Sequence, residues 1–346
     1  MKNRLRLLNS DSLIACLMFV LILLGSCSKD VIYFPDSVQG EVDKAIVNGF
    51  DGIIVYVNAP GRTSFYSAGF DNREKQTLAD AHSLFKIASI SKLYIAASAA
   101  KLVANNQLSL DAKLTDLLPE VEGKIENANE ISLEMMLQHR SGIIDYSDEP
   151  EIEGETFDEH MSFMARVYDK EASFKPNKKH SYSNSNYLLI AEIIDRTLGY
   201  SHHDYIQAKI LDPLDLINTY NVYQDSDTTR VMSGYLIGWD PNLRSWDFPL
   251  PGGNMVATAE DVGTFLRALI DGTLFTDKEQ EIYTSVYEYE HTGWLPGYCS
   301  IARYHSDIDA VVVQFVNTSG TESFWLDIER VYNRIVMALE KEESKS

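Results

Sequence analysis

The stretch Phe85-Lys86-Ile87-Ala88-Ser89-Ile90-Ser91-Lys92 leads into an alanine-rich, helix-forming run that continues to Ala104. Ser89 and Lys92 are three positions apart, so at the start of a helix their side chains lie on one face. A helix N-terminus stabilises negative charge, and a neutral lysine beside a serine can accept its proton. These residues therefore favour an activated serine nucleophile. The alternative is a helix-capping serine beside a solvated lysine, because this spacing alone is common.

Two further short motifs follow later in the chain. Tyr182-Ser183-Asn184 precedes a helix that we predict over residues 186–198. His291-Thr292-Gly293 ends a strand-like run, and its glycine would let a substrate backbone approach the strand closely. Taken singly, the first motif describes a packed aromatic followed by a capping asparagine. The information lies in the order of the three motifs along the chain.

In that order the motifs resemble those of the serine β-lactamase and penicillin-binding-protein superfamily, in particular its branch of class C β-lactamases, D-Ala-D-Ala carboxypeptidases and related esterases. The resemblance extends over residues 36–339, with further similar landmarks at residues 137–143, 211–214, 252–253 and 258–261. It implies an α+β fold of the β-lactamase/transpeptidase type. An antiparallel sheet would be flanked by N- and C-terminal helices, with an all-helical region inserted.

The resemblance also implies a role for each motif residue. Ser89 would be the nucleophile, and Lys92 and Tyr182 would share the proton transfers. Asn184 would bind the substrate amide and orient Lys92. The backbone N–H groups of Ser89 and Trp294 would form the oxyanion hole. The remaining substrate-binding residues implied are His291, Thr292, Gly293 and Trp294.

Several positions depart from the family pattern. His291 stands where β-lactamases usually carry lysine, and its unperturbed pKa is about 6.5 rather than about 10.4. We therefore expect activity on carboxylate-bearing substrates to fall as the pH rises past the His291 pKa, unless His291 only hydrogen-bonds a neighbour. Trp294 is bulky, Arg140 replaces a small residue, and the segment between Gly272 and His291 is short for a region that usually includes a cleft-wall strand.

The strand and helix patterns indicate how the chain is organised. Hairpins are predicted at both ends of the chain, and an amphipathic helix is predicted at its C-terminal end. Between them the patterns are mainly helical. We expect an α/β sheet domain made of residues 36–104 and 252–342, and an inserted, mainly helical domain at 105–251.

Composition excludes several classes of protein. With 45% hydrophobic and 23% charged residues the chain is globular, and a net charge of −21 would repel nucleic acid. The adjacent His202 and His203 have no partner at metal-ligand spacing, so a core or solvated position is the better interpretation for both. We expect no metal and no cofactor. Cys299 is the one cysteine outside the N-terminal region, so no internal disulfide framework is expected.

The N-terminus has the pattern of an export signal. Lys2, Arg4 and Arg6 precede an apolar run too short to span a bilayer. The run ends in Leu24-Gly25-Ser26-Cys27, which resembles a bacterial lipobox. We expect residues 1–26 to be a lipoprotein signal peptide, Cys27 to carry the lipid and 27–35 to be a tether. The alternative is an ordinary secretory signal with an unrelated cysteine.

These observations lead to one expected function. The protein is expected to be a serine hydrolase, lipid-anchored in the bacterial cell envelope and facing outside the cytoplasm. It would act through an acyl-enzyme on D-Ala-type peptides, including cell-wall peptides, on β-lactam-like amides or on small esters. The alternative from another class is a penicillin-binding or sensor-like module without turnover.

Overall fold

A computed structural model describes residues 37–152, 155 and 159–344. The chain divides into two units, 1–34 and 35–346, and all described residues belong to the second. The predicted signal peptide, the lipid-attachment residue Cys27 and the tether lie outside the described residues. Among the described helices, none combines the length and apolarity needed to cross a bilayer.

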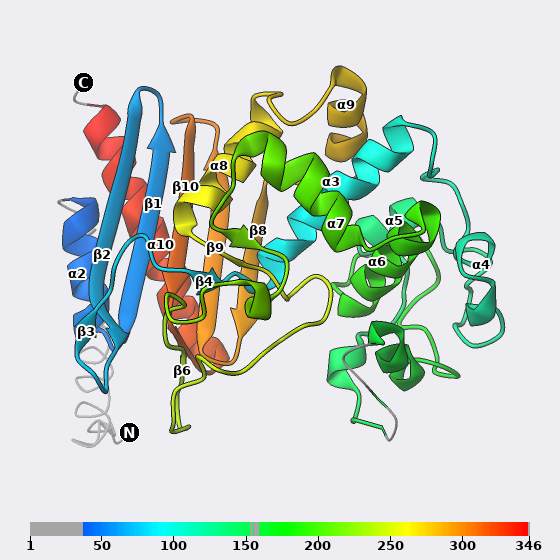
Figure 1. Ribbon diagram of the computed structural model, residues 1–346, viewed down its shortest axis with the longest axis horizontal. Helices are drawn as coiled ribbons and strands as arrows, with labels where there is room; N and C mark the ends of the chain where they lie inside the picture. Colours follow the sequence, from blue (N-terminus) through cyan, green and yellow to red (C-terminus); the bar gives the residue numbers. More distant parts are fainter. Residues whose placement is uncertain (1–36, 153–154, 156–158, 345–346) are drawn as a thin grey trace, which may run out of the picture. The chain divides into compact units, whose positions relative to one another are not determined.

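The core element is a six-stranded antiparallel sheet built from both ends of this unit (Figure 1). Strands β1 and β10 pair at its centre, with Ile53 opposite Val316. In spatial order the strands are β3 (Thr77–Leu78), β2 (Arg62–Asn72), β1 (Gly52–Ala59), β10 (Ala310–Val316), β9 (Tyr298–His305) and β8 (Glu290–Leu295).

Side chains alternate across β1, and this divides the core into two layers. Ile53, Val55 and Val57 pack against α2 (Val38–Val47) and α10 (Glu322–Glu343), which cover one face of the sheet (Figure 1). Ile54 and Tyr56 belong to the larger cluster on the other face. That cluster is continuous with the helical part of the molecule, so the sheet supports the helices that carry the site.

The helical part surrounds α3 (Ser91–Ala104), which is buried from Ser91 to Leu102. The other α-helices are α4 (Leu114–Leu117), α5 (Leu133–Leu137), α6 (Asn184–Leu198), α7 (His202–Ile206), α8 (Ala259–Ile270) and α9 (Asp277–Val286). The shorter turns are η1 (Ala88–Ile90), η2 (Pro119–Val121), η3 (Tyr146–Asp148), η4 (His160–Arg166), η5 (Gln207–Leu211), η6 (Asp212–Leu214) and η7 (Tyr223–Asp225).

Two small sheets link the helical part to the rest. The strands are β4 (Phe85–Lys86), β7 (Val256–Ala257) and β5 (Thr219–Tyr220) in one, and β11 (Thr318–Ser319) with β6 (Tyr235–Leu236) in the other.

The α+β fold class predicted from the sequence is confirmed. Both hairpins form, and helices flank the sheet at both ends of the described chain. Sequence analysis did not predict the short strands β5 and β6, because each has only two residues and so shows no alternation of apolar and polar side chains. Both lie within 105–251 and pair with strands outside it. The division of the chain at 104 and 251 therefore stays a prediction.

Candidate active site

Ser89 lies on a tight turn at the entrance to the buried helix α3. Ala88, directly before it, adopts a left-handed conformation with φ of +53°, which a residue with a side chain adopts at a cost of about 1 kcal/mol. Ser91 holds the turn, because its hydroxyl donates to the Ala88 carbonyl at 2.7 Å and accepts from the Met255 N–H at 3.2 Å. The turn thus presents Ser89 at the N-terminal end of the helix.

Lys92 lies beside Ser89, as the spacing of the two residues predicts. Its Nζ is 2.9 Å from Ser89 Oγ and 2.8 Å from the Gly252 carbonyl oxygen, and the residue is 1% exposed. Burial lowers the pKa of Lys92 to about 7, and the negative charge of Asp145 partly opposes the shift. A large fraction of Lys92 is therefore the neutral amine near neutral pH, the form that can accept a proton from Ser89.

Gly252 is required where it supports Lys92. Its φ is +80°, and an added Cβ would lie 3.2 Å from both Lys92 Cγ and Tyr187 Cβ. A glycine therefore lets the carbonyl approach the Lys92 amine. Sequence analysis matched Gly252 to a family landmark but assigned it no part in the site.

Tyr182 reaches Ser89 from the loop before α6. Its hydroxyl donates to Ser89 Oγ at 2.9 Å, and its ring stacks on the His139 ring with centroids 4.5 Å apart. Burial raises the pKa of Tyr182 above its ordinary value. The phenol is therefore neutral at physiological pH. This difference from Lys92 assigns the two groups different parts in proton transfer.

Asn184 lies at the first turn of α6, but it does not contact Lys92. Its side-chain amide donates to Asp145 Oδ2 at 2.8 Å, and its backbone N–H donates to the same oxygen at 2.9 Å. No hydrogen bond joins Asn184 to Lys92 among the described residues, so the expectation that Asn184 orients Lys92 stays a prediction. The Gly252 carbonyl holds Lys92, and Asp145 holds Asn184 at the edge of the site.

Strand β8 forms the opposite side of the site and packs against the nucleophile turn. A Cβ on Gly293 would lie 2.6 Å from the Ile87 carbonyl oxygen and 2.2 Å from Ser300 Oγ. Gly293 is thus needed for contact with the turn, and its part in access by a substrate backbone stays a prediction. This contact brings the backbone of Trp294 beside the Ser89 turn. Thr292 is half-buried, and the Trp294 side chain is largely exposed.

A cleft of about 840 Å³ lies beside Tyr182 and His291. Volumes of this size accept peptides and drug-sized ligands. Acidic side chains of the lining are Glu288, Glu290 and Glu329, and basic ones are Arg140 and Arg303. Glu329 pairs with Arg303 through two contacts of 2.9 Å, whereas Glu288 is exposed.

Residues 41–286 match the sequence profile of the Beta-lactamase family. The chain belongs to this family. It is 27% identical over 204 residues to penicillin-binding protein 4 of Amycolatopsis lactamdurans, covering 56% of this chain and 53% of that protein. It is 23% identical over 261 residues to a teichoic acid D-alanine hydrolase of Staphylococcus aureus, covering 72% of this chain and 62% of that protein. The chain thus spans between half and two thirds of the length of these relatives.

Solved structures of the family have the same fold. D-amino acid amidase from Ochrobactrum anthropi SV3, complexed with L-phenylalanine amide, superposes with a TM-score of 0.77 at 25% identity, covering 89% of this chain and 98% of that one. A β-lactamase/D-alanine carboxypeptidase from Pseudomonas syringae shares the fold with a TM-score of 0.71 at 16% identity, and the match covers 86% of this chain and 97% of that one.

The departures from the Beta-lactamase family pattern have visible structural correlates. Arg140 donates from Nε to Asn177 Oδ1 at 2.7 Å, so it ties two loops together at the cleft wall. The short segment between Gly272 and His291 contains α9, followed by Tyr287 and Glu288 on the wall. A helix thus precedes β8 here.

Besides Gly252, two other residues of the site were missed by sequence analysis. Asp145 positions Asn184 and raises the pKa of Lys92, and His139 supports the Tyr182 ring. The His139 Nδ1 accepts from the Ser183 N–H at 3.1 Å, which fixes the loop that carries Tyr182. His139 stands in the landmark at 137–143, and that was its only signal. For Asp145 the sequence held no pattern.

The environment of His291 changes the expected pH dependence. Burial, with the nearby Lys92 charge, lowers the pKa of His291 to about 3. Its Nδ1 contacts the Thr292 carbonyl oxygen, so in the neutral ring Nδ1 carries the proton. The imidazole is therefore neutral from pH 5.5 to 8. The expected fall in activity across that range is replaced by a rise that follows deprotonation of Lys92.

We therefore expect His291→Asn to retain a rate that rises with a midpoint near pH 7. The Lys92 pKa of about 7 sets the midpoint of this rise in rate, because His291 is already neutral and does not change charge near pH 7. The measurement is kcat/KM for a neutral ester between pH 5.5 and 8.5 in wild type and variant. If the wild-type rate fell with rising pH and the variant's did not, His291 would be the titrating group after all.

Proposed function

We propose that this Beta-lactamase family protein is a serine hydrolase that forms an acyl-enzyme at Ser89 with amides or esters of D-amino acids. One observation carries the proposal. Two proton-transfer groups meet at the same hydroxyl, Lys92 Nζ and Tyr182 OH, each 2.9 Å from Ser89 Oγ. An activated serine with these two partners is suited to acyl transfer.

Each group has a distinct step in this mechanism. The neutral Lys92 amine accepts the Ser89 proton as Oγ attacks the substrate carbonyl. The backbone N–H groups of Ser89 and Trp294 then stabilise the oxyanion, and losing one such donor typically costs about 10²–10³ in kcat. The proton returns from Lys92 through the Tyr182 hydroxyl to the leaving amine or alcohol. Water, activated in the same way, then releases the acid from Ser89.

The cleft offers an exposed carboxylate to substrates with a free amino group. Glu288 presents this carboxylate at the cleft wall, and the neutral His291 offers no cation for a substrate carboxylate. Of the two arginines in the lining, Arg303 is paired with Glu329 and Arg140 is held by Asn177. The named activities of two relatives point the same way, because one is a teichoic acid D-alanine hydrolase and another a D-amino acid amidase. We therefore place D-alanyl esters and D-amino acid amides ahead of peptides that end in a carboxylate, such as cell-wall peptides.

Glu288→Gln is expected to lower kcat/KM for a D-alanyl ester about fivefold and to leave its N-acetyl derivative unchanged. A partly exposed ion pair contributes about 1 kcal/mol, which corresponds to that factor. The matched control is Glu281→Gln, an exposed acid on α9 outside the cleft lining. An equal loss with both substrates would contradict an interaction with the amino group. The L-alanyl ester, tested alongside, should be the poorer substrate.

We further propose that the protein is a lipoprotein of the bacterial cell envelope, anchored through Cys27 and facing outside the cytoplasm. The basic N-terminus, the apolar run and the lipobox-like Leu24–Cys27 support this location. Two or more acyl chains anchor a protein stably, whereas one chain does so only marginally.

The full chain carrying Cys27→Ala is expected to leave the membrane fraction. Cys16→Ala is the matched control, because Cys16 lies within the apolar run and should not be lipidated. The measurement is fractionation of envelopes with detection of the chain by antibody. Retention of the Cys27 variant on membranes would argue against the lipid anchor.

A further inference from the structure

A second cavity lies in the helical part of the molecule and shares no lining residue with the cleft at Tyr182. Its volume is about 510 Å³, and His160, Glu192, Asp195 and His202 line it. The proposed hydrolase mechanism uses none of these residues. Their side chains are nonetheless of the types that bind metal ions.

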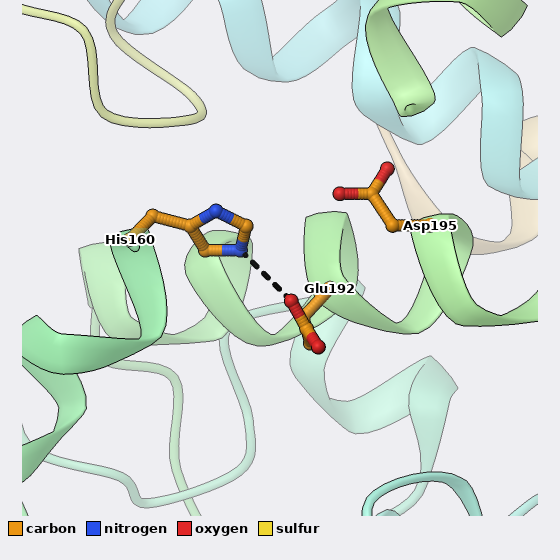
Figure 2. Close-up of side chains that lie close together, drawn as sticks. All are labelled: His160, Glu192 and Asp195. Carbon is orange, nitrogen blue, oxygen red and sulfur yellow. Dashed lines mark ion pairs between the residues drawn. The ribbon is translucent and has the colours of Figure 1, made fainter. Parts of the chain in front are cut away.

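Three of these side chains converge on one point (Figure 2). Glu192 and Asp195 are three positions apart on α6 and therefore lie on one face of the helix. His160 comes from η4 and directs Nε2 toward Glu192 Oε2 at 3.4 Å. One potential ligand atom from each of the three residues lies within 4.8 Å of the others.

Two buried imidazole nitrogens of this cavity have no hydrogen-bond partner among the described residues. His160 Nε2 is buried and has no hydrogen-bond partner in the described part of the chain. The same is true of Nε2 of His202, whose side chain is 4% exposed and lines the cavity. Of these two atoms, His160 Nε2 lies beside the two carboxylates, in the position of a metal ligand.

The surrounding residues hold the carboxylates in position. His202 donates its backbone N–H and, at 2.8 Å, its Nδ1–H to Asp195 Oδ1. Among the described residues no hydrogen bond ends on Asp195 Oδ2. Arg196 Nε donates to Glu192 Oε1 at 2.6 Å, so Oε2 faces His160. Metal sites typically have such supporting hydrogen bonds behind the ligands.

We propose that His160, Glu192 and Asp195 bind a divalent transition-metal ion of the Zn²⁺ type. Zinc bonds to histidine nitrogen and carboxylate oxygen are about 2.0–2.2 Å long, so tetrahedral ligand atoms lie about 3.4 Å apart. The His160–Glu192 separation of 3.4 Å matches that spacing. The imidazole favours Zn²⁺ over Mg²⁺ and Ca²⁺, which prefer oxygen ligands alone.

Such an ion would join η4 to α6, the helix that follows the Tyr182 loop.

Sequence analysis found no metal ligand near His202 and His203, because the acidic partner Asp195 precedes them on another helix and His160 is remote in the chain. This site goes beyond the proposed hydrolase activity and does not depend on it.

The test is equilibrium dialysis of the chelator-treated full chain against Zn²⁺. We expect one ion to bind per chain. His160→Gln and Glu192→Gln should each lower the affinity for Zn²⁺ at least about 100-fold, because loss of even a supporting residue behind the ligands lowers metal affinity about 10–100-fold. His82→Gln is the matched control. Its Nδ1 is 3.9 Å from Glu260 in an exposed pair that belongs to no cluster of three potential ligands among the described residues. Binding that survives both cluster substitutions would overturn the proposal.

Two further measurements do not depend on how well the variants fold. Zn²⁺ at 100 times its Kd should raise the Tm of the unaltered chain by about 5 °C. Co²⁺ should give the visible spectrum of a four-coordinate nitrogen and oxygen site. A sulfur-to-cobalt charge-transfer band would instead show binding by cysteine, and this result, or an unchanged Tm, would overturn the proposal.

Discussion

Ser89→Ala is expected to abolish acylation and to lower kcat/KM for a D-alanyl ester by at least about 10⁴-fold. In serine hydrolases that act through a catalytic unit, loss of the nucleophile removes nearly all chemistry beyond binding and oxyanion stabilisation. Ser89 Oγ is the atom at which both Lys92 and Tyr182 converge. The measurement is initial-rate kinetics together with the Tm of each protein.

The matched control is Ser98→Ala on α3, the helix that follows the Ser89 turn. Ser98 is buried in α3, and its hydroxyl donates to the Tyr94 carbonyl at 2.9 Å and takes no part in the site. Its removal should leave kcat/KM within about twofold of wild type. Ester turnover by Ser89→Ala near the wild-type rate would mean that another group acts as nucleophile.

Lys92→Met should lower kcat/KM by about 10²–10⁴-fold, the contribution of a positioned general base. Methionine fills a similar volume but cannot accept a proton. The variant should also lose the rate increase near pH 7. The sign follows from the pKa of about 7: the neutral amine is the active form, so the wild-type rate rises with pH and reaches a plateau above pH 8.

Lys86→Met is a demanding control for this result. Burial lowers the pKa of Lys86 to about 7 as well, but its Nζ donates to the carbonyl oxygens of Leu243, Arg244 and Trp246. This variant should be less stable but should keep the increase in rate near pH 7. If Lys86→Met lost that increase and Lys92→Met kept it, the assignment of Lys92 as the base would be wrong.

The contacts that the sequence predicted are those set by local spacing. Ser89 lies on the η1 turn and Lys92 three residues later at the start of α3, so their 2.9 Å contact follows from local helical spacing. The two terminal hairpins follow from alternation and short turns. The pairing of β1 with β10 joins residues far apart in sequence. That pairing was not predicted, since alternation specifies no partner strand; the expectation was only of a sheet domain made from both ends of the chain.

The parts that escaped prediction depend on burial and on long-range contacts. The Asp145 carboxylate meets Asn184 across 39 residues, and the Gly252 carbonyl meets Lys92 across 160. His291 was judged by its ordinary pKa, but the structure surrounds it and shifts that pKa to about 3. A charge state depends on the packing around the group, which a motif does not reveal.

Covalent labelling of the full chain with a fluorescent penicillin, followed by peptide mapping, tests the central claim most directly. We expect one adduct on the peptide that carries Ser89, absent from Ser89→Ala and formed more than about 100-fold more slowly by Lys92→Met. Release of the label over time would show turnover, whereas a permanent adduct would indicate the penicillin-binding, sensor-like alternative. Labelling at another residue, or equal labelling of Ser89→Ala, would contradict the account.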